Sequence, residues 1–176
     1  MASRRVWQHR GVAVDHTGVL FTTEDPSEVL SCMEDLAVRG DGRGWLNLQP
    51  WVDDEHQPPT SPLGRMFSSL GPAVPVATWV PAHRRGRRAV PGTVGISHAA
   101  GRFAVRRLAD GGVAVPASWA VRQDHTRRGL VFELPDAVAV GNILGFLLAA
   151  IGVLSGVPTE GRWVADVAVQ RSSRRA

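Results

Sequence analysis

Hydrophobic positions recur along the chain with two spacings, one typical of β-strands and the other of helices. In several segments bounded by glycine, proline or aspartate, apolar residues alternate with polar ones or form short runs, as strands do. We expect strands over residues 10–15, 18–23, 45–52, 76–80, 93–97, 119–123, 130–134 and 163–169. Helical spacing and helix-ending glycines predict helices over 26–39, between Gly101 and Gly111, and within 137–159.

A short motif occurs twice, once near each end of the chain. Asp15-His16-Thr17 and Asp124-His125-Thr126 each lie between two apolar runs and are followed by Gly18 or Gly129. Each copy then leads to an aspartate beside a proline, a helix and a strand. This matched order predicts a duplicated hairpin, helix and strand unit with the motif in each hairpin turn, because aspartate and glycine favour turns. The alternative is that two unrelated hairpins use the same turn sequence.

The order of elements predicts an α+β protein with a mixed or antiparallel sheet and helices on one face. Residues 93–170 are expected to run strand, helix, strand, strand, helix, strand, the order of a ferredoxin-like split βαβ unit. The predicted organisation is a first unit over 1–52, a Pro-rich and Arg-rich connecting region over 53–92 with one strand and a helical turn near 63–70, a second unit over 93–171, and a basic tail over 172–176. One compact domain is the alternative.

Residues 137–159 contain no charged side chain and are long enough to be considered as a membrane span. Glycines, Asn142 and Pro158 reduce its hydrophobicity and length, so a helix buried in protein or facing another subunit is favoured. A membrane-associated protein is the alternative. Cys32 is the only cysteine, and the N-terminus lacks the apolar core of a secretory signal, so we expect a cytoplasmic location.

Charge is distributed unevenly. Residues 1–60 contain five arginines and ten acidic residues, whereas 61–176 contain fifteen arginines and six acidic residues. Every basic residue is an arginine, and the absence of lysine excludes a lysine Schiff base and a Walker-type phosphate loop. Guanidinium groups bind phosphate and carboxylate through paired hydrogen bonds. The predicted anion-binding residues are Arg84, Arg85, Arg87 and Arg88 in a loop, and Arg127 and Arg128 in the second hairpin turn. A solvated turn is the alternative for the last two.

Two histidines are weak candidates for a general base. His98 lies where a strand leads into a helix, and His125 follows Asp124, although adjacent residues in a turn rarely face each other. The histidines lack metal-ligand spacing, and the stretch Asp53-Asp54-Glu55-His56 is typical of a solvated loop, so we expect no metal and no cofactor.

These features favour a soluble, non-catalytic binding or interaction protein with an arginine-rich face. Its anionic partner would be a nucleic acid or a phosphorylated ligand. A small enzyme that acts on a phosphorylated or carboxylated substrate, with a histidine as general base, is the alternative. A protein partner or a homo-oligomer is also open, since the acidic first unit can meet the basic second unit.

Overall fold

The fold is taken from a computed structural model, which describes residues 3–9, 12–53 and 71–171, with side chains from Ala13 onwards. The expected helical turn near 63–70, the stretch Asp54-Glu55-His56 and the basic tail 172–176 lie outside the described residues. The helices are α1 (Ser27–Arg39), α3 (Ala104–Asp110) and α4 (Val140–Leu154). The strands are β1 (Ser3–His9), β2 (Val12–Thr22), β3 (Gly44–Pro50), β4 (Val76–Val80), β5 (His83–Arg85), β6 (Arg88–Val90), β7 (Thr93–Ser97), β8 (Ala120–His125), β9 (Gly129–Glu133) and β10 (Arg162–Gln170).

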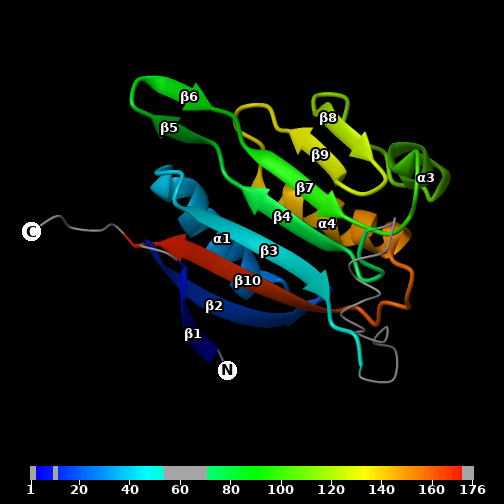
Figure 1. The fold of residues 1–176 in the computed structure, drawn as a ribbon, viewed down its shortest axis with the longest axis horizontal. Coiled ribbons are helices and arrows are strands. Elements are labelled where there is room, and N and C mark those ends of the chain that lie inside the picture. The colour runs from blue at the N-terminus through cyan, green and yellow to red at the C-terminus, as the bar shows by residue number, and fades with distance from the viewer. Residues whose placement is uncertain (1–2, 10–11, 54–70, 172–176) are drawn as a thin grey trace, which may run out of the picture.

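Eight of the described strands form one sheet in the order β1-β2-β10-β3-β4-β7-β9-β8, and every neighbouring pair is antiparallel (Figure 1). The remaining two, β5 and β6, form a separate hairpin between β4 and β7. This arrangement confirms the α+β class with a large antiparallel sheet.

Strand β10 lies between β2 and β3, far along the sheet from β9, which precedes it in the chain. The elements from β7 to β10 do follow the order strand, helix, strand, strand, helix, strand. However, β3 and β4 separate β10 from β7, so the strands of this segment do not form a sheet by themselves. The ferredoxin-like arrangement and the duplication are therefore not confirmed.

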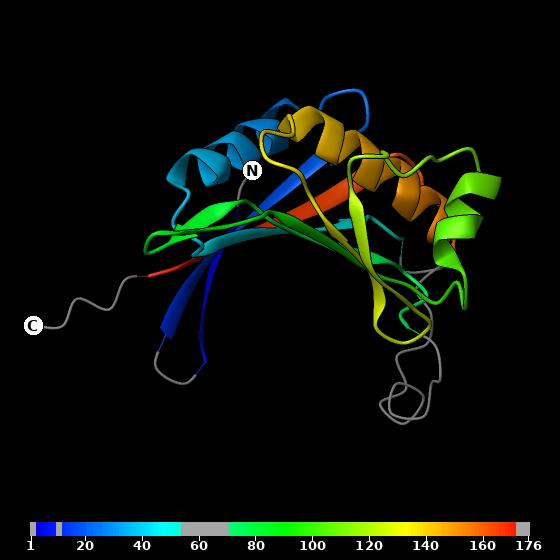
Figure 2. The same cartoon turned by 90° about the horizontal axis from the view of Figure 1, so that it is seen from above.

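The helices lie on one face of the curved sheet, with α3 beside α4 (Figure 2). Alternate residues of the strands point to this face, as the strand period of two requires. Leu46, Leu48, Val94 and Ile96 are fully buried there beneath the helices. Asn47, between the two leucines, faces the opposite side of the sheet, and we call that side the open face because no described helix covers it.

Helix α4 contains 15 residues and no charged side chain, and seven of its apolar residues are buried against the sheet and the other helices. Trp119 and Phe132 contribute aromatic rings around its Phe146, with ring centroids 4.8 and 5.5 Å from that side chain. Among the described residues, no helix has the length and apolar character needed to cross a membrane.

The expected turn at Asp15-His16-Thr17-Gly18 is wrong, because β2 continues through these residues. Asp15 pairs with Val6 of β1 on one side and with Val169 of β10 on the other. A turn here would break the hydrogen-bond ladders on both sides of β2. The first hairpin instead joins β1 and β2, one strand earlier in the chain than predicted.

Candidate anion-binding site

The arginine cluster at 84–88 forms a two-stranded hairpin, where a loop was expected. Strands β5 and β6 pair with Arg85 directly opposite Arg88. Gly86 begins the two-residue turn with φ +64°, a conformation that glycine adopts without steric cost. The backbone N–H of Arg84 donates a hydrogen bond of 3.2 Å to the carbonyl of Gly40, which holds the hairpin against the turn between α1 and β3.

Four guanidinium groups on this hairpin have no acidic partner among the described residues. Arg84, Arg85, Arg87 and Arg88 are all exposed, and none of them forms an ion pair with a described residue. Like charges directly opposite each other in an antiparallel pair are destabilising, by a few tenths of a kcal/mol up to about 1 kcal/mol. The hairpin therefore carries a repulsion that an anion bound between the arginines would relieve.

At the tip of the β8–β9 hairpin, the side chains of Asp124 and His125 accept hydrogen bonds from backbone N–H groups of the protein. The carboxylate of Asp124 accepts hydrogen bonds of 3.2 Å from the backbone N–H groups of Ala104 and Val105, so it caps α3. His125 Nδ1 accepts hydrogen bonds from the backbone N–H groups of Arg127 and Arg128, at 3.1 and 3.3 Å. The tip therefore leaves the two guanidinium groups exposed and without a described ion pair.

The structure places the two predicted groups of arginines at opposite ends of the sheet (Figure 1). Hairpin β5–β6 leads into the first residue of β7, Thr93. The tip of the β8–β9 hairpin lies at the other end of β7, where Ile96 pairs with Leu130. Strand β7 has five residues, a length of about 16 Å. The six arginines thus form two separate groups, and only an extended molecule could contact both.

His98 is completely buried and does not face solvent. Its Nδ1 accepts a hydrogen bond of 3.2 Å from the N–H of Ala100, whereas its Nε2 has no described partner. Burial lowers the pKa of the imidazole, while the negative charge of Asp124 opposes this shift. The buried ring therefore lies out of reach of a substrate, and it shapes the turn after β7.

A chain of polar side chains crosses the open face and was not predicted from the sequence. His16 Nδ1 lies 3.0 Å from both carboxylate oxygens of Asp166, so it donates its proton to that carboxylate. Asn47 donates from Nδ2 to Asp166 at 3.4 Å and accepts from the hydroxyl of Thr78 at 2.8 Å. The four residues come from the adjacent strands β2, β10, β3 and β4. Alternation within each strand marks them as polar-face positions, but only the strand pairing brings them together.

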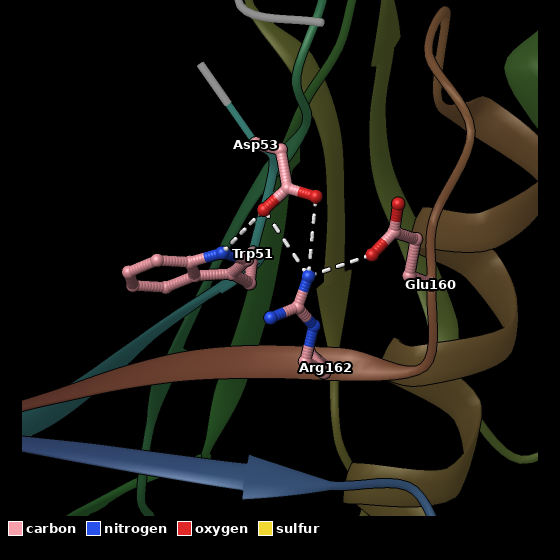
Figure 3. Close-up of polar contacts among 4 residues, drawn as sticks. All are labelled: Trp51, Asp53, Glu160 and Arg162. Carbon is pink, nitrogen blue, oxygen red and sulfur yellow. Dashed lines mark hydrogen bonds and ion pairs between the residues drawn. The ribbon is translucent and has the colours of Figure 1, made fainter. Parts of the chain in front are cut away.

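Other arginines are already neutralised by carboxylates. Figure 3 shows Arg162 between Asp53 and Glu160, with Nη2 to oxygen distances of 3.1 and 2.7 Å, while the indole of Trp51 donates to Asp53. These contacts raise the pKa of Arg162, chiefly through the hydrogen bond to Glu160. This cluster lies where β3 ends and β10 begins, and its guanidinium group is already paired with two carboxylates.

Arg122 and Arg171 are likewise paired, with Glu133 and Asp15 respectively. Within the described part of the chain, no three histidine, cysteine, aspartate or glutamate side chains come together as metal ligands. Comparisons of the chain with protein-family models, curated proteins and solved structures find no match.

Proposed function

We propose that this is a non-catalytic binding protein that holds an anionic partner on the β5–β6 hairpin. The observation that carries the proposal is the set of four exposed arginines on a hairpin outside the main sheet, to which the described part of the chain supplies no acidic partner. Arginines at positions such as 162 show that this chain can neutralise its guanidinium groups internally. The hairpin arginines, by contrast, are left available to an external anion.

The partner is expected to be a polyanion. A single phosphate or carboxylate cannot contact four arginines spread over both strands and the turn, whereas successive phosphates of a chain can. Arg127 and Arg128, at the other end of β7, then provide a second contact for the same extended partner. Binding of this kind is electrostatic and must weaken as salt concentration rises.

A salt titration with matched variants tests the proposal. Binding of a short fluorescein-labelled DNA duplex is measured by anisotropy for the wild type, for Arg85→Gln/Arg88→Gln, and for Arg162→Gln/Arg171→Gln. Both double variants lose the same charge, but the second removes arginines that are already paired. The hairpin variant should reduce the slope of log K against log salt by about 1.8, because each phosphate contact contributes about 0.9. An unchanged slope, or no binding by the wild type, would overturn the proposal.

A second candidate function, general-base catalysis, is favoured by one observation. Asp166 orients the ring of His16 through Nδ1, and this leaves Nε2, which has no described hydrogen bond, to act as a base on the open face. The imidazole is only 25 % exposed, so a substrate would have to lie against the sheet. Turnover of a phosphate ester or carboxylic ester that disappears in His16→Gln would support this function, and equal turnover by the variant would exclude it.

A further inference from the structure

Phe103 combines two features that fold stability alone does not explain. Its aromatic side chain is 69 % exposed. Its backbone has φ +61° and ψ +45°, the left-handed conformation that is disfavoured for any residue with a Cβ atom. Strained backbone conformations cluster at active sites, ligand clamps and switch regions.

Phe103 also occupies the position just before α3, where serine, threonine, aspartate or asparagine would normally cap a helix. It makes no capping hydrogen bond with its side chain. Asp124 of the β8–β9 hairpin supplies the cap instead, because its carboxylate accepts hydrogen bonds from the N–H groups of Ala104 and Val105. The aromatic ring is therefore not needed to begin the helix, and the helix end is already occupied by a carboxylate.

Exposed arginines adjoin Phe103 in the chain. Arg102 precedes it, and Arg106 and Arg107 follow it within α3. The capping bonds of Asp124 hold the tip that carries Arg127 and Arg128 against the start of α3. The two segments that this cap joins therefore carry five exposed arginines and one exposed aromatic ring.

Little negative charge neutralises this group. Arg106 lies 3.8 Å from Asp110, but both side chains are largely exposed, at 82 % and 71 %, so water screens the pair. None of the other four arginines has an ion pair among the described residues. The carboxylate of Asp124 is already bonded to two backbone N–H groups.

We infer that Phe103 is a base-stacking platform and that this surface binds single-stranded nucleic acid. The surface comprises Arg102, Phe103, Arg106, Arg107, Arg127 and Arg128. An exposed ring stacks on any unpaired base, while neighbouring arginines contact the phosphates. A duplex hides the faces of its bases and cannot use the ring in this way. The inference rests on the proposed function and names the class of its partner.

A membrane surface is a poorer fit than a nucleic acid. A helix that lies in a membrane interface needs a broad apolar face turned towards the lipid. The apolar residues Ala104 and Leu108 of α3 are instead completely buried in the protein. One ring is too small to replace such a face, but it is sufficient for stacking on one base.

The inference is tested by comparing single-stranded and duplex binding. Labelled oligo(dT), oligo(rU) and a DNA duplex of the same length are titrated with the wild type, Phe103→Gly, Phe103→Trp and Val38→Ala. Glycine accepts the backbone conformation of Phe103, so Phe103→Gly should fold at least as stably as the wild type. Val38 is 86 % exposed and lies on α1, outside the proposed binding surface. Val38→Ala is therefore the control for losing an exposed apolar side chain.

Phe103→Gly should weaken binding of both single strands by about tenfold, and Phe103→Trp should preserve it, because stacking on one base contributes about this much. Duplex affinity should not change, and Val38→Ala should behave as the wild type. Equal effects of Phe103→Gly on single strands and duplex, or no effect on either, would overturn the inference. So would Phe103-dependent binding to anionic lipid vesicles in place of oligonucleotides.

The hairpin variant Arg85→Gln/Arg88→Gln separates the two proposals. If it weakens binding while Phe103→Gly does not, the stacking platform fails and the hairpin site stands. If only Phe103→Gly weakens binding, the nucleic acid is held at α3 and the hairpin proposal fails. No binding to any of the probes overturns both.

Discussion

The two Asp-His-Thr sequences have the same side chains and different structural roles. In β2 the strand sends neighbouring residues to opposite faces, so Asp15 pairs with Arg171 while His16 pairs with Asp166 on the open face. At the β8–β9 tip the chain reverses after His125, so Asp124 caps α3 and His125 holds the turn. A short motif therefore acquires its role from the backbone that presents it.

Position in the sheet explains why the two backbones differ. Strand β2 has neighbours on both sides, β1 and β10, and their ladders require an extended conformation through the motif. Among the described strands, β8 is an edge strand that pairs with β9 alone, so the chain can turn within the motif, directly after His125. Three of the four predictions below test this contrast, and one tests the buried histidine beside the second motif's aspartate; they begin with the largest effect.

The glycine that follows the second motif is expected to be indispensable. Gly129 has φ +74°, and a Cβ atom there would collide with the carbonyl oxygen of Ile96. Gly129→Ala should lower the free energy of unfolding by about 3 kcal/mol or more, as strain and overpacking combine. Gly86→Ala is the control, since Gly86 has φ +64° but open space around it, and should cost only about 1–2 kcal/mol. Urea denaturation followed by circular dichroism measures both, and equal costs would contradict the collision.

Asp124 is expected to matter for the stability of α3. Asp124→Ala removes the acceptor for two N–H groups and should lower the free energy of unfolding by about 1–2 kcal/mol, as loss of a helix cap does. Hydrogen exchange at Ala104 and Val105 should become faster. Arg171→Gln is the comparison at the first motif, where an exposed ion pair should contribute less than about 1 kcal/mol. Unchanged protection of the two amides would show that the cap is not formed.

Acid should destabilise the protein in part through His98. Burial lowers its pKa in the folded state, so when the pH falls below the ordinary value of about 6.5 the unfolded chain binds a proton that the folded protein does not. This contribution to stability is present above pH 6.5 and is lost as the pH falls towards the folded-state pKa. His98→Asn keeps a hydrogen-bond acceptor for the N–H of Ala100. In this variant the free energy of unfolding should fall less steeply with decreasing pH, by at most about 1.4 kcal/mol per pH unit. Parallel profiles for variant and wild type would contradict this.

The contact between His16 and Asp166 should give the smallest effect. A double-mutant cycle with His16→Ala and Asp166→Ala should yield a coupling free energy of about 0.5–1 kcal/mol, since the pair is only partly buried. The control cycle, His16→Ala with Arg171→Gln, joins residues that share no described contact and should be additive. A coupling of zero in the first cycle would mean that the polar chain on the open face is not formed in solution.

Local signals predicted most elements of the fold. Pro26 and Gly40 bound a helix that the structure has at 27–39, and the alternation around Asp166 predicts the strand found at 162–170. The first hairpin was misplaced because Asp15 and Gly18 favour turns, whereas the ladders with β1 and β10 override that local preference. The sequence also identified the arginine clusters as exposed, because runs of charge are costly to bury.

Long-range pairing limited what could be predicted about the sites. His16 and Asp166 are 150 residues apart, and nothing in either local sequence indicates the other. The cap on α3 is supplied 20 residues further along by Asp124, so the ordinary signal of a capping residue before the helix is missing. The helix expected between Gly101 and Gly111 begins only at Ala104, so Phe103 lies before it with a left-handed backbone and an exposed ring, which helical spacing does not indicate.

The placement of β10 also affects how the chain is made. On the ribosome, β2 and β3 are synthesised long before the strand that lies between them in the finished sheet. Until β10 arrives, each has an edge that a strand of another nascent chain can occupy. Closure of the sheet must also wait for contacts between residues remote in sequence, which is a slow step in folding. A nascent chain is therefore most prone to pair with other chains and aggregate just before β10 inserts.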